Sequence, residues 1–147
     1  MNAPAALSRR EWAADLSPHE LYALLTLRVA VFVVEQHSAY PDLDGRDLSD
    51  GARHHWVSAG EEVLGCLRIL DEDNGVQRIG RMCIAPSARG TGIGRRLMEA
   101  AMADLDGAAC VLDAQREAVS FYQKFGFTVS GDTYDDFGVP HVPMRRG

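Results

Sequence analysis

The sequence predicts an α/β (α+β) protein with a mixed, mostly antiparallel sheet of six to seven strands and about four flanking helices. Strand-like runs separated by short turns fill the middle of the chain, which is typical of an antiparallel meander. After residue 92 the apolar residues take the spacing of an amphipathic helix, and strands and helices then alternate. A length of 147 residues favours one domain, taken as residues 1–147, with one hydrophobic core.

The start of the chain has no periodic pattern. Residues 1–9 are expected to form a loose leader, and residues 11–14 a short first strand. The segment lacks the basic start and long apolar middle of a secretory signal peptide. No uninterrupted apolar stretch approaches the length of a membrane span, so no membrane partner is expected.

A helix start is predicted at Pro18. Ser17 can cap this helix, proline suits the first helical position, and Glu20 can complete a capping box. The apolar run 29–34 continues the helix directly, but its β-branched residues leave helix and strand both open. The polar, turn-rich residues 37–53 are expected to form an irregular loop.

The remaining elements follow from alternation, turns and helical spacing. Three meander strands are predicted at 55–59, 63–70 and 76–84. The second half of the chain is then expected to contain a helix at 92–105, a strand at 109–112, a helix at 117–125, a strand at 127–129, a polar loop at 132–138 and a closing strand at 141–145.

The three cysteines are odd in number and lie in apolar surroundings: Cys66, Cys83 and Cys110. They are therefore expected to be reduced core thiols of a cytoplasmic protein, with neither a disulfide framework nor a metal site.

Charge is unevenly distributed along this acidic chain, whose net charge is −6. Residues 78–98 contain five arginines and no acidic residue, which suits a small anionic ligand better than a nucleic acid. Residues 35–50 carry five acidic residues and one arginine. Together with residues 134–136, this stretch could line an acceptor entrance and attract a cationic amine, although a solvated acidic loop is the simpler interpretation.

The segment 89–94 is a glycine-rich turn between a predicted strand and a predicted helix. Glycine lets the backbone approach a ligand closely, and the first N–H groups of a helix have no intrahelical partner. Arg89, Arg95 and Arg96 add positive charge at the same point. The turn can therefore bind an anion such as the diphosphate of a nucleotide cofactor.

Two common nucleotide-binding motifs do not fit this turn, and glycine-rich turns also occur without any ligand. A P-loop requires lysine and then serine or threonine after its last glycine, whereas Gly94 is followed by two arginines. This argues against a nucleotide-dependent kinase. A Rossmann fingerprint requires a wider glycine spacing than Gly90-x-Gly92-x-Gly94, in a βαβ unit.

The segment 84–98 resembles motif A of the GNAT acetyltransferase superfamily. The signature of that motif is Gln/Arg-x-x-Gly-x-Gly/Ala, and Arg89, Gly92 and Gly94 match it. Residues 118–127 resemble motif B, which typically ends in Tyr-x-Lys-x-Gly-Phe. The chain is similar to the ElaA-like subgroup over about residues 10–146, on the further segments 29–36, 42–45 and 140–145.

The resemblance implies a GNAT fold, whose sheet splays between its fourth and fifth strands to receive the pantetheine arm of acetyl-CoA. The fourth strand would pair with pantetheine, and the N–H groups of residues 89–95 would hold the pyrophosphate. Gln115 stands where many members carry asparagine, so its contact with pantetheine is a departure from the pattern. The implied cofactor-binding residues are Met82, Cys83, Ile84, Arg89, Gly90, Thr91, Gly92, Ile93, Gly94, Arg95, Gln115 and Tyr122.

The resemblance also implies direct acetyl transfer to an uncharged amine within a ternary complex. Tyr122 matches the family tyrosine that protonates the leaving thiolate, and a core aromatic residue is the alternative. Glu35 is the first candidate for the general base, because the apolar run before it would bury it and raise its pKa. An ordinary paired carboxylate is the alternative. His141 and Asp113 are the other candidates.

The acceptor is expected to be a primary amine of a small molecule or peptide, and its identity stays open. Arg28 could face a substrate carboxylate, but a pairing with a nearby acidic residue is the simpler expectation. A homodimer is the default oligomeric state. A non-catalytic acyl-CoA sensor with the same fold is the alternative function, and the presence of Tyr122 favours the enzyme.

Overall fold

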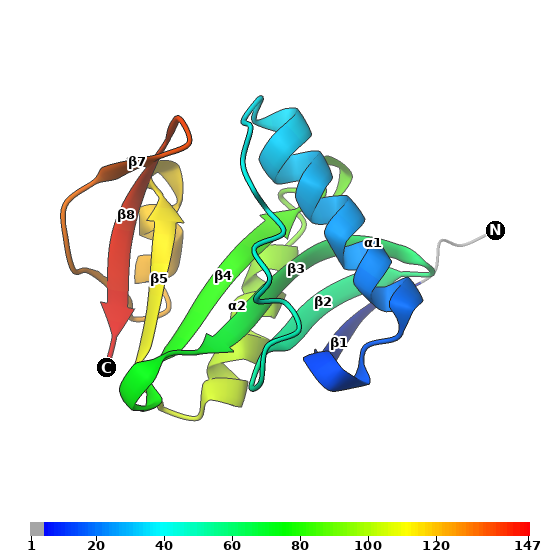
Figure 1. Ribbon diagram of the computed structural model, residues 1–147, viewed down its shortest axis with the longest axis horizontal. Helices are drawn as coiled ribbons and strands as arrows, with labels where there is room; N and C mark the ends of the chain where they lie inside the picture. The colour runs from blue at the N-terminus through cyan, green and yellow to red at the C-terminus, as the bar shows by residue number, and fades with distance from the viewer. Residues whose placement is uncertain (1–4) are drawn as a thin grey trace.

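The computed structural model describes residues 5–147 (Figure 1), so positions 1–4 of the expected leader lie outside the described residues. The rest of the leader prediction is wrong, because strand β1 spans Ala6–Trp12. The expected strand at 11–14 is wrong at its end, where Ala13–Asp15 forms a 3₁₀ turn. Strand β1 lies at the sheet edge and is largely exposed, so it carries no alternating apolar pattern.

The described residues form one sheet of eight strands in the order β1-β2-β3-β4-β5-β8-β6, with β7 paired to β8. Neighbouring strands are antiparallel except β4 and β5. The extra strand is β7, where the sequence predicted a loop, since its short, exposed acidic run has no strand signal. The remaining strands are β2 (Arg53–Ala59), β3 (Glu62–Asp71), β4 (Gln77–Ile84), β5 (Cys110–Gln115), β6 (Thr128–Val129), β7 (Tyr134–Asp136) and β8 (Val139–Arg146).

The sheet opens between β4 and β5. The two parallel strands pair only at Gln77–Cys110 and Arg78–Val111, and Figure 1 shows them diverging beyond these residues. Arg81 in β4 has a positive φ of 52°, and the β3–β4 register shifts nearby. Such an irregularity bends a strand and re-aims its side chains. The predicted splay between the fourth and fifth strands is confirmed.

Helix α1 spans Pro18–Val29 and begins at the predicted capping box. The Glu20 N–H donates to Ser17 Oγ at 3.1 Å, and the Ser17 N–H donates to Glu20 Oε1 at 2.9 Å. The ambiguous apolar run is helical, because Ala30–Glu35 continues the helix as a π-helical turn. This turn places Glu35 and the loop after it at the end of the sheet where β4 and β5 lie farthest apart.

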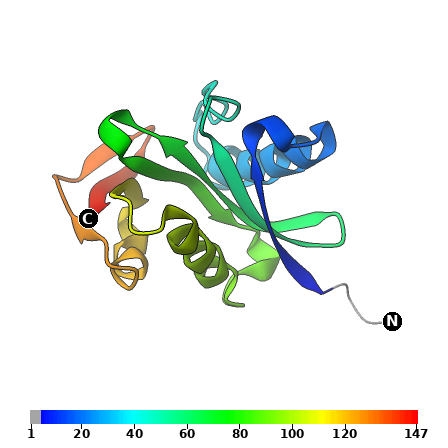
Figure 2. The same cartoon turned by 90° about the horizontal axis from the view of Figure 1, so that it is seen from below.

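The other α-helices of the described chain are α2 (Ile93–Leu105) and α3 (Val119–Gln123), so residues 5–147 contain three rather than the expected four. Helix α1 covers one face of the sheet, while α2 and α3 cover the other (Figures 1 and 2). The larger core lies under α2 and includes Met98 and Met144; the smaller one lies under α1 around Leu24. None of the described helices has the length and apolar character that crossing a membrane requires.

All three cysteines are buried and free, as predicted. Cys66 on β3 and Cys83 on β4 are register partners, and their Sγ atoms lie 3.8 Å apart.

Candidate active site

A cleft of about 910 Å³ occupies the space between the diverging strands. Strand β4 forms one wall, β5 and β8 the other, and α3 and the loop after α1 complete the lining. The cleft brings together most residues predicted from the sequence: Glu35, Met82, Cys83, Ile84, Arg89, Gly94, Asp113, Gln115, Tyr122 and His141. The remaining predicted residues lie in the turn that begins α2: Gly90, Thr91, Gly92, Ile93 and Arg95.

The turn before α2 requires glycine for its backbone conformation. Gly90 and Gly92 have φ values of 77° and 85°, and a Cβ added at either would have no protein atom within 4 Å. Only glycine adopts such angles without strain. The space beside both residues is therefore open to a ligand that approaches the backbone closely.

The start of α2 presents unpaired backbone donors. Within residues 5–147, the first α2 N–H group that bonds back to the preceding turn is that of Arg96, which donates to Gly92 O at 3.1 Å. The N–H groups of residues 93–95 have no intrahelical partner and lie at the positive end of the helix dipole. The Thr91 hydroxyl donates to the Ala88 carbonyl and fastens the turn.

Gly94 has a different role, because it has an ordinary helical φ. A Cβ there would lie 3.4 Å from Phe121 Cζ and 3.5 Å from Met82 Cε. These are ordinary van der Waals distances, so a methyl group at Gly94 would contact the α3 and β4 side chains beside the cleft without a clash.

The arginines around this turn are bonded to other groups of the protein, which the sequence did not indicate. Arg89 forms a two-pronged ion pair with Glu35, with both N–O distances at 2.6 Å. Arg95 pairs with Glu99 at 2.8 Å, and Arg96 donates to Ser8 Oγ at 2.8 Å. The groups that this turn offers to an anion are therefore mainly its backbone N–H groups.

The expected raised pKa of Glu35 is wrong. The Glu35 side chain is 40% exposed, and hydrogen bonds from Arg89 lower its pKa. The apolar run before Glu35 packs as a helix and leaves the carboxylate at the surface, within reach of an arginine 54 residues away. Asp113, at the other wall, is likewise paired, with Arg78 at 2.7 Å.

Tyr122 projects across the cleft from α3. Its hydroxyl donates to Met82 Sδ at 3.4 Å, and its side chain is only 9% exposed. Burial raises the pKa of Tyr122 to about 12. The phenol therefore keeps its proton at physiological pH and can donate it.

One ring nitrogen of His141 forms a hydrogen bond with the backbone, and the other can accept a proton. Its Nδ1 lies 2.8 Å from the Val139 carbonyl oxygen. Because a carbonyl only accepts, Nδ1 carries the proton and the neutral ring keeps its lone pair on Nε2. Tyr134 stacks on the imidazole with an interplanar angle of 27°. His141 is thus held in a form that can accept a proton.

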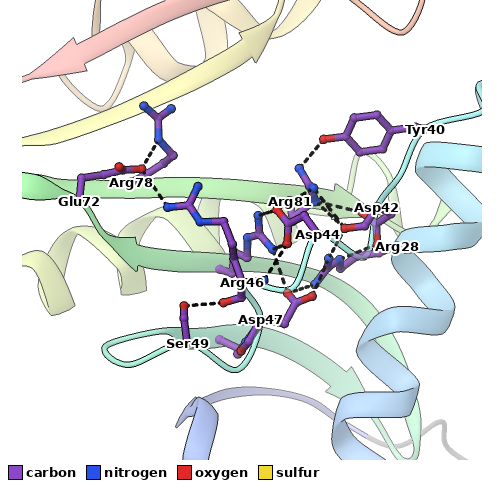
Figure 3. A network of polar contacts seen from close by, with 12 residues as sticks. Arg28, Tyr40, Asp42, Asp44, Arg46, Asp47, Ser49, Glu72, Arg78 and Arg81 are labelled. Carbon is purple, nitrogen blue, oxygen red and sulfur yellow. Dashed lines mark hydrogen bonds and ion pairs between the residues drawn. The ribbon is translucent and has the colours of Figure 1, made fainter.

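The interpretation of the acidic stretch 35–50 as a solvated loop is wrong for Asp42 and Asp47, which are buried, whereas Glu35 and Asp44 line the cleft. Figure 3 shows Asp42, Asp44 and Asp47 turned toward arginines of α1 and the sheet. Arg28 is paired, as expected, with Asp42 at 3.1 Å and Asp47 at 2.5 Å, and all three side chains are buried. The sequence did not reveal Arg68, which bridges Asp47 and Asp44 at 3.0 and 2.6 Å.

This network fastens the loop 37–52 over the sheet. Burial disfavours the Asp47 charge, but hydrogen bonds from Arg28 outweigh burial, and the pKa of Asp47 is lowered. The stabilisation is therefore complete above the ordinary aspartate pKa of about 4 and is lost as the pH falls through the lowered value. The loop is held rigidly at neutral pH.

Two contacts join the loop after α1 to the part of the sheet that contains β5 and β8, across the wide end of the cleft. Gln115 Nε2 on β5 donates to Gln36 Oε1 at 3.3 Å. Ser38 Oγ donates to the Phe137 carbonyl in the β7–β8 turn at 2.9 Å. Because of these two contacts, the cleft is a channel with protein on each side at its wide end.

Solved structures with the same fold point to the acyl-CoA N-acyltransferases. The crystal structure of an acyl-CoA N-acyltransferase from Pseudomonas aeruginosa superposes with a TM-score of 0.92 and 36% identity, covering 97% of this chain and 100% of that one. Escherichia coli ElaA gives a TM-score of 0.89 at the same identity and coverage.

Sequence comparisons lead to the same class. The family model "Acetyltransferase (GNAT) domain" matches residues 13–146. The UPF0039 protein Rv2851c of Mycobacterium tuberculosis is 47% identical over 142 residues, which cover 94% of this chain and 91% of that protein. The chain therefore belongs to the GNAT acetyltransferase family, and the resemblance to its ElaA-like members is confirmed. Enzymes of this family use acetyl-CoA as cosubstrate and an amine as acceptor.

Proposed function

We propose that this chain, as one domain, is an N-acetyltransferase that moves the acetyl group of acetyl-CoA directly to a primary amine of a small-molecule or peptide acceptor. The observation that carries the proposal is the divergence of β4 and β5 after two residue pairs, beside a glycine turn with free N–H groups. An extended arm can pair with the open edge of a strand while its phosphates bind at a helix start.

The residues of the cleft fit acetyl-CoA. The backbone of Met82, Cys83 and Ile84 faces the gap left by β5 and would pair with the pantetheine amides. The N–H groups of residues 89–95 would hold the pyrophosphate where Gly90 and Gly92 leave open space. The Gln115 side chain would give up its hydrogen bond to Gln36 and form one with a pantetheine amide instead.

In the proposed reaction the amine nitrogen attacks the thioester carbonyl carbon. A C–N bond forms, the C–S bond breaks, and CoA leaves as a thiolate that takes the Tyr122 proton. His141 Nε2 takes the proton that the amine loses. We assign the base to His141 because Glu35 and Asp113 are both held by guanidinium groups, whereas Nε2 has a free lone pair.

Direct transfer through a ternary complex is favoured over an acetyl-cysteine intermediate. The hydrogen bond between Cys83 and Cys66 and burial both raise the pKa of the Cys83 thiol, so Cys83 is not a thiolate at neutral pH. Three unpaired, buried cysteines also support a cytoplasmic location. The homodimer stays a prediction.

The His141→Asn variant is expected to lower kcat by about a hundredfold, because removing a general base typically costs that much. The measurement is CoA release, followed with a thiol reagent at saturating acetyl-CoA and with the best acceptor of a panel of primary amines.

His19→Asn, an exposed position on α1, is the matched control and should behave like the wild type. An unchanged kcat in His141→Asn would place the base elsewhere. A wild-type protein that binds acetyl-CoA but releases no CoA with any amine would support the alternative, a non-catalytic acyl-CoA sensor.

A further inference from the structure

We infer that Cys66 and Cys83 form a dithiol site that reacts with disulfides of CoA, becoming a cross-strand disulfide and releasing CoA as a thiol. The inference relies on the CoA-binding cleft of the proposed function and goes beyond acetyl transfer, which uses neither thiol. Two independent features carry it: the facing geometry of the two cysteines and the position of Cys83 in the wall of the cleft.

The two cysteines have the backbone arrangement that a disulfide requires. Cys66 on β3 and Cys83 on β4 lie directly opposite each other in an antiparallel pair of strands. Residues in such positions have Cα atoms about 4.5–5.5 Å apart, within the range of about 4.4–6.8 Å that disulfides span. The two Sγ atoms already lie 3.8 Å apart and share a hydrogen bond. A disulfide can therefore form by rotation of the two side chains within the existing register of the sheet.

The two thiols differ in their access to the cleft. Cys83 lines the cleft, together with its β4 neighbours Met82 and Ile84. Cys66 lies behind Cys83, in the core beneath α1, and is not among the residues that line the cleft. A ligand in the cleft can thus reach Cys83, while Cys66 is placed to attack the Cys83 sulfur afterwards. A thiol that reacts first, with a resolving thiol beside it, is the usual arrangement of a redox-active pair.

The same wall of the cleft is where the sulfur of bound CoA is expected. The backbone of Met82, Cys83 and Ile84 would pair with the pantetheine arm, which ends in that sulfur. Tyr122, the proposed proton donor to this sulfur, places its hydroxyl 3.4 Å from Sδ of Met82, the residue before Cys83. A disulfide of CoA would therefore carry its S–S bond to Cys83 through the binding of its CoA part. Holding two reactants together in this way greatly accelerates their reaction.

The exchange balances when the oxidant is a disulfide of the form CoA–S–S–R. The Cys83 thiolate attacks the CoA sulfur, so that a Cys83–CoA disulfide forms, the bond to the other sulfur breaks, and R–SH leaves with the proton from Cys83. Cys66 then attacks the Cys83 sulfur, and CoA leaves as a thiol with the proton from Cys66. The two cysteines are oxidised to one disulfide, and CoA–S–S–R is reduced to two thiols.

The test compares the mixed disulfide of CoA and glutathione with glutathione disulfide, a matched reagent that lacks the CoA part. Each is incubated with reduced protein at mildly alkaline pH, because the hydrogen bond with Cys66 and burial raise the pKa of Cys83, whose thiolate is the attacking form. Intact-protein mass spectrometry and thiol titration follow the reaction. We expect the CoA reagent to form the internal disulfide at least about tenfold faster. Saturating acetyl-CoA, which would fill the same cleft, should remove this advantage.

Cysteine-to-alanine variants identify the two thiols. Cys66→Ala should stop at the mixed disulfide and retain one CoA, because the resolving thiol is absent. Cys83→Ala should acquire neither CoA nor an internal disulfide. Cys110→Ala is the matched control and should react like the wild type, since Cys110 is also buried but lies on β5 and is not among the residues that line the cleft. Far-ultraviolet circular dichroism checks that each variant is folded.

Equal rates with the two reagents, no protection by acetyl-CoA, or no internal disulfide in the wild type would each overturn the inference, and none of these results depends on a variant. A protein that forms the disulfide as expected but never acetylates an amine would contradict the proposed function and leave this inference intact. Acetylation of an amine without faster exchange with the CoA reagent would overturn this inference alone.

Discussion

Gly92→Val should abolish acetyl-CoA binding while the protein stays folded. Gly92 has a φ of 85°, no protein atom lies within 4 Å of its Cβ position, and the free N–H groups of α2 follow it directly. A valine would fill the space through which a phosphate approaches the backbone, and it would drive the turn away from its left-handed conformation. The measurement is isothermal calorimetry with acetyl-CoA, together with far-ultraviolet circular dichroism.

Gly107→Val provides a matched control at the opposite end of the same helix. Gly107 has a φ of 82° and the same open surroundings, so valine there causes a similar backbone strain of about 1–3 kcal/mol. The control variant should lose a comparable amount of stability and keep its affinity for acetyl-CoA. Wild-type affinity in Gly92→Val would refute the assignment of the pyrophosphate to this turn.

Tyr122→Phe should lower kcat by about a hundredfold or more and leave the dissociation constant of CoA nearly unchanged. The substitution keeps the ring that packs against Phe127 and removes the hydroxyl that lies 3.4 Å from Met82 Sδ. Loss of a general acid typically costs a factor of about 10²–10⁴. Because burial raises the pKa of Tyr122 to about 12, the phenol should add no titration to the neutral part of the pH profile.

The test combines steady-state kinetics across neutral and alkaline pH with calorimetric CoA affinity. Tyr22→Phe, at an exposed position of α1, serves as the control and should match the wild type. Equal losses of kcat and CoA affinity would mean that the hydroxyl acts in binding. An unchanged kcat would exclude Tyr122 as the acid.

The sequence predicted best the features that depend on local chemistry. The capping box of Ser17 and Glu20 is such a feature, because three residues of spacing determine its geometry. The glycine turn at 90–92 is another, since glycine adopts a left-handed backbone at the lowest cost. Family motifs around this turn and Tyr122 then led to the splayed sheet.

Features that depend on distant contacts were missed or misjudged. The pKa of Glu35 is decided by Arg89, which no local pattern connects to it. The acidic stretch became a set of buried ion pairs because arginines such as Arg68 project from strands beneath it. Arg68 lies in a strand between apolar neighbours, and an acidic loop upstream was the one signal that could have indicated its partners.

The two unpredicted or misplaced strands share a physical cause. Strands β1 and β7 are largely exposed, so neither buries a regular set of apolar side chains. Their positions depend on backbone pairing with β2 and β8, which leaves little trace in residue type.

The most direct test of the central claim is a thermal-shift comparison of acetyl-CoA, CoA, ATP and NAD. A ligand present at about 100 times its dissociation constant adds roughly 2.7 kcal/mol to the stability of the folded state, or several degrees in Tm. We expect acetyl-CoA and CoA alone to raise the Tm. No shift with either form of CoA, or a shift with ATP or NAD instead, would contradict the account.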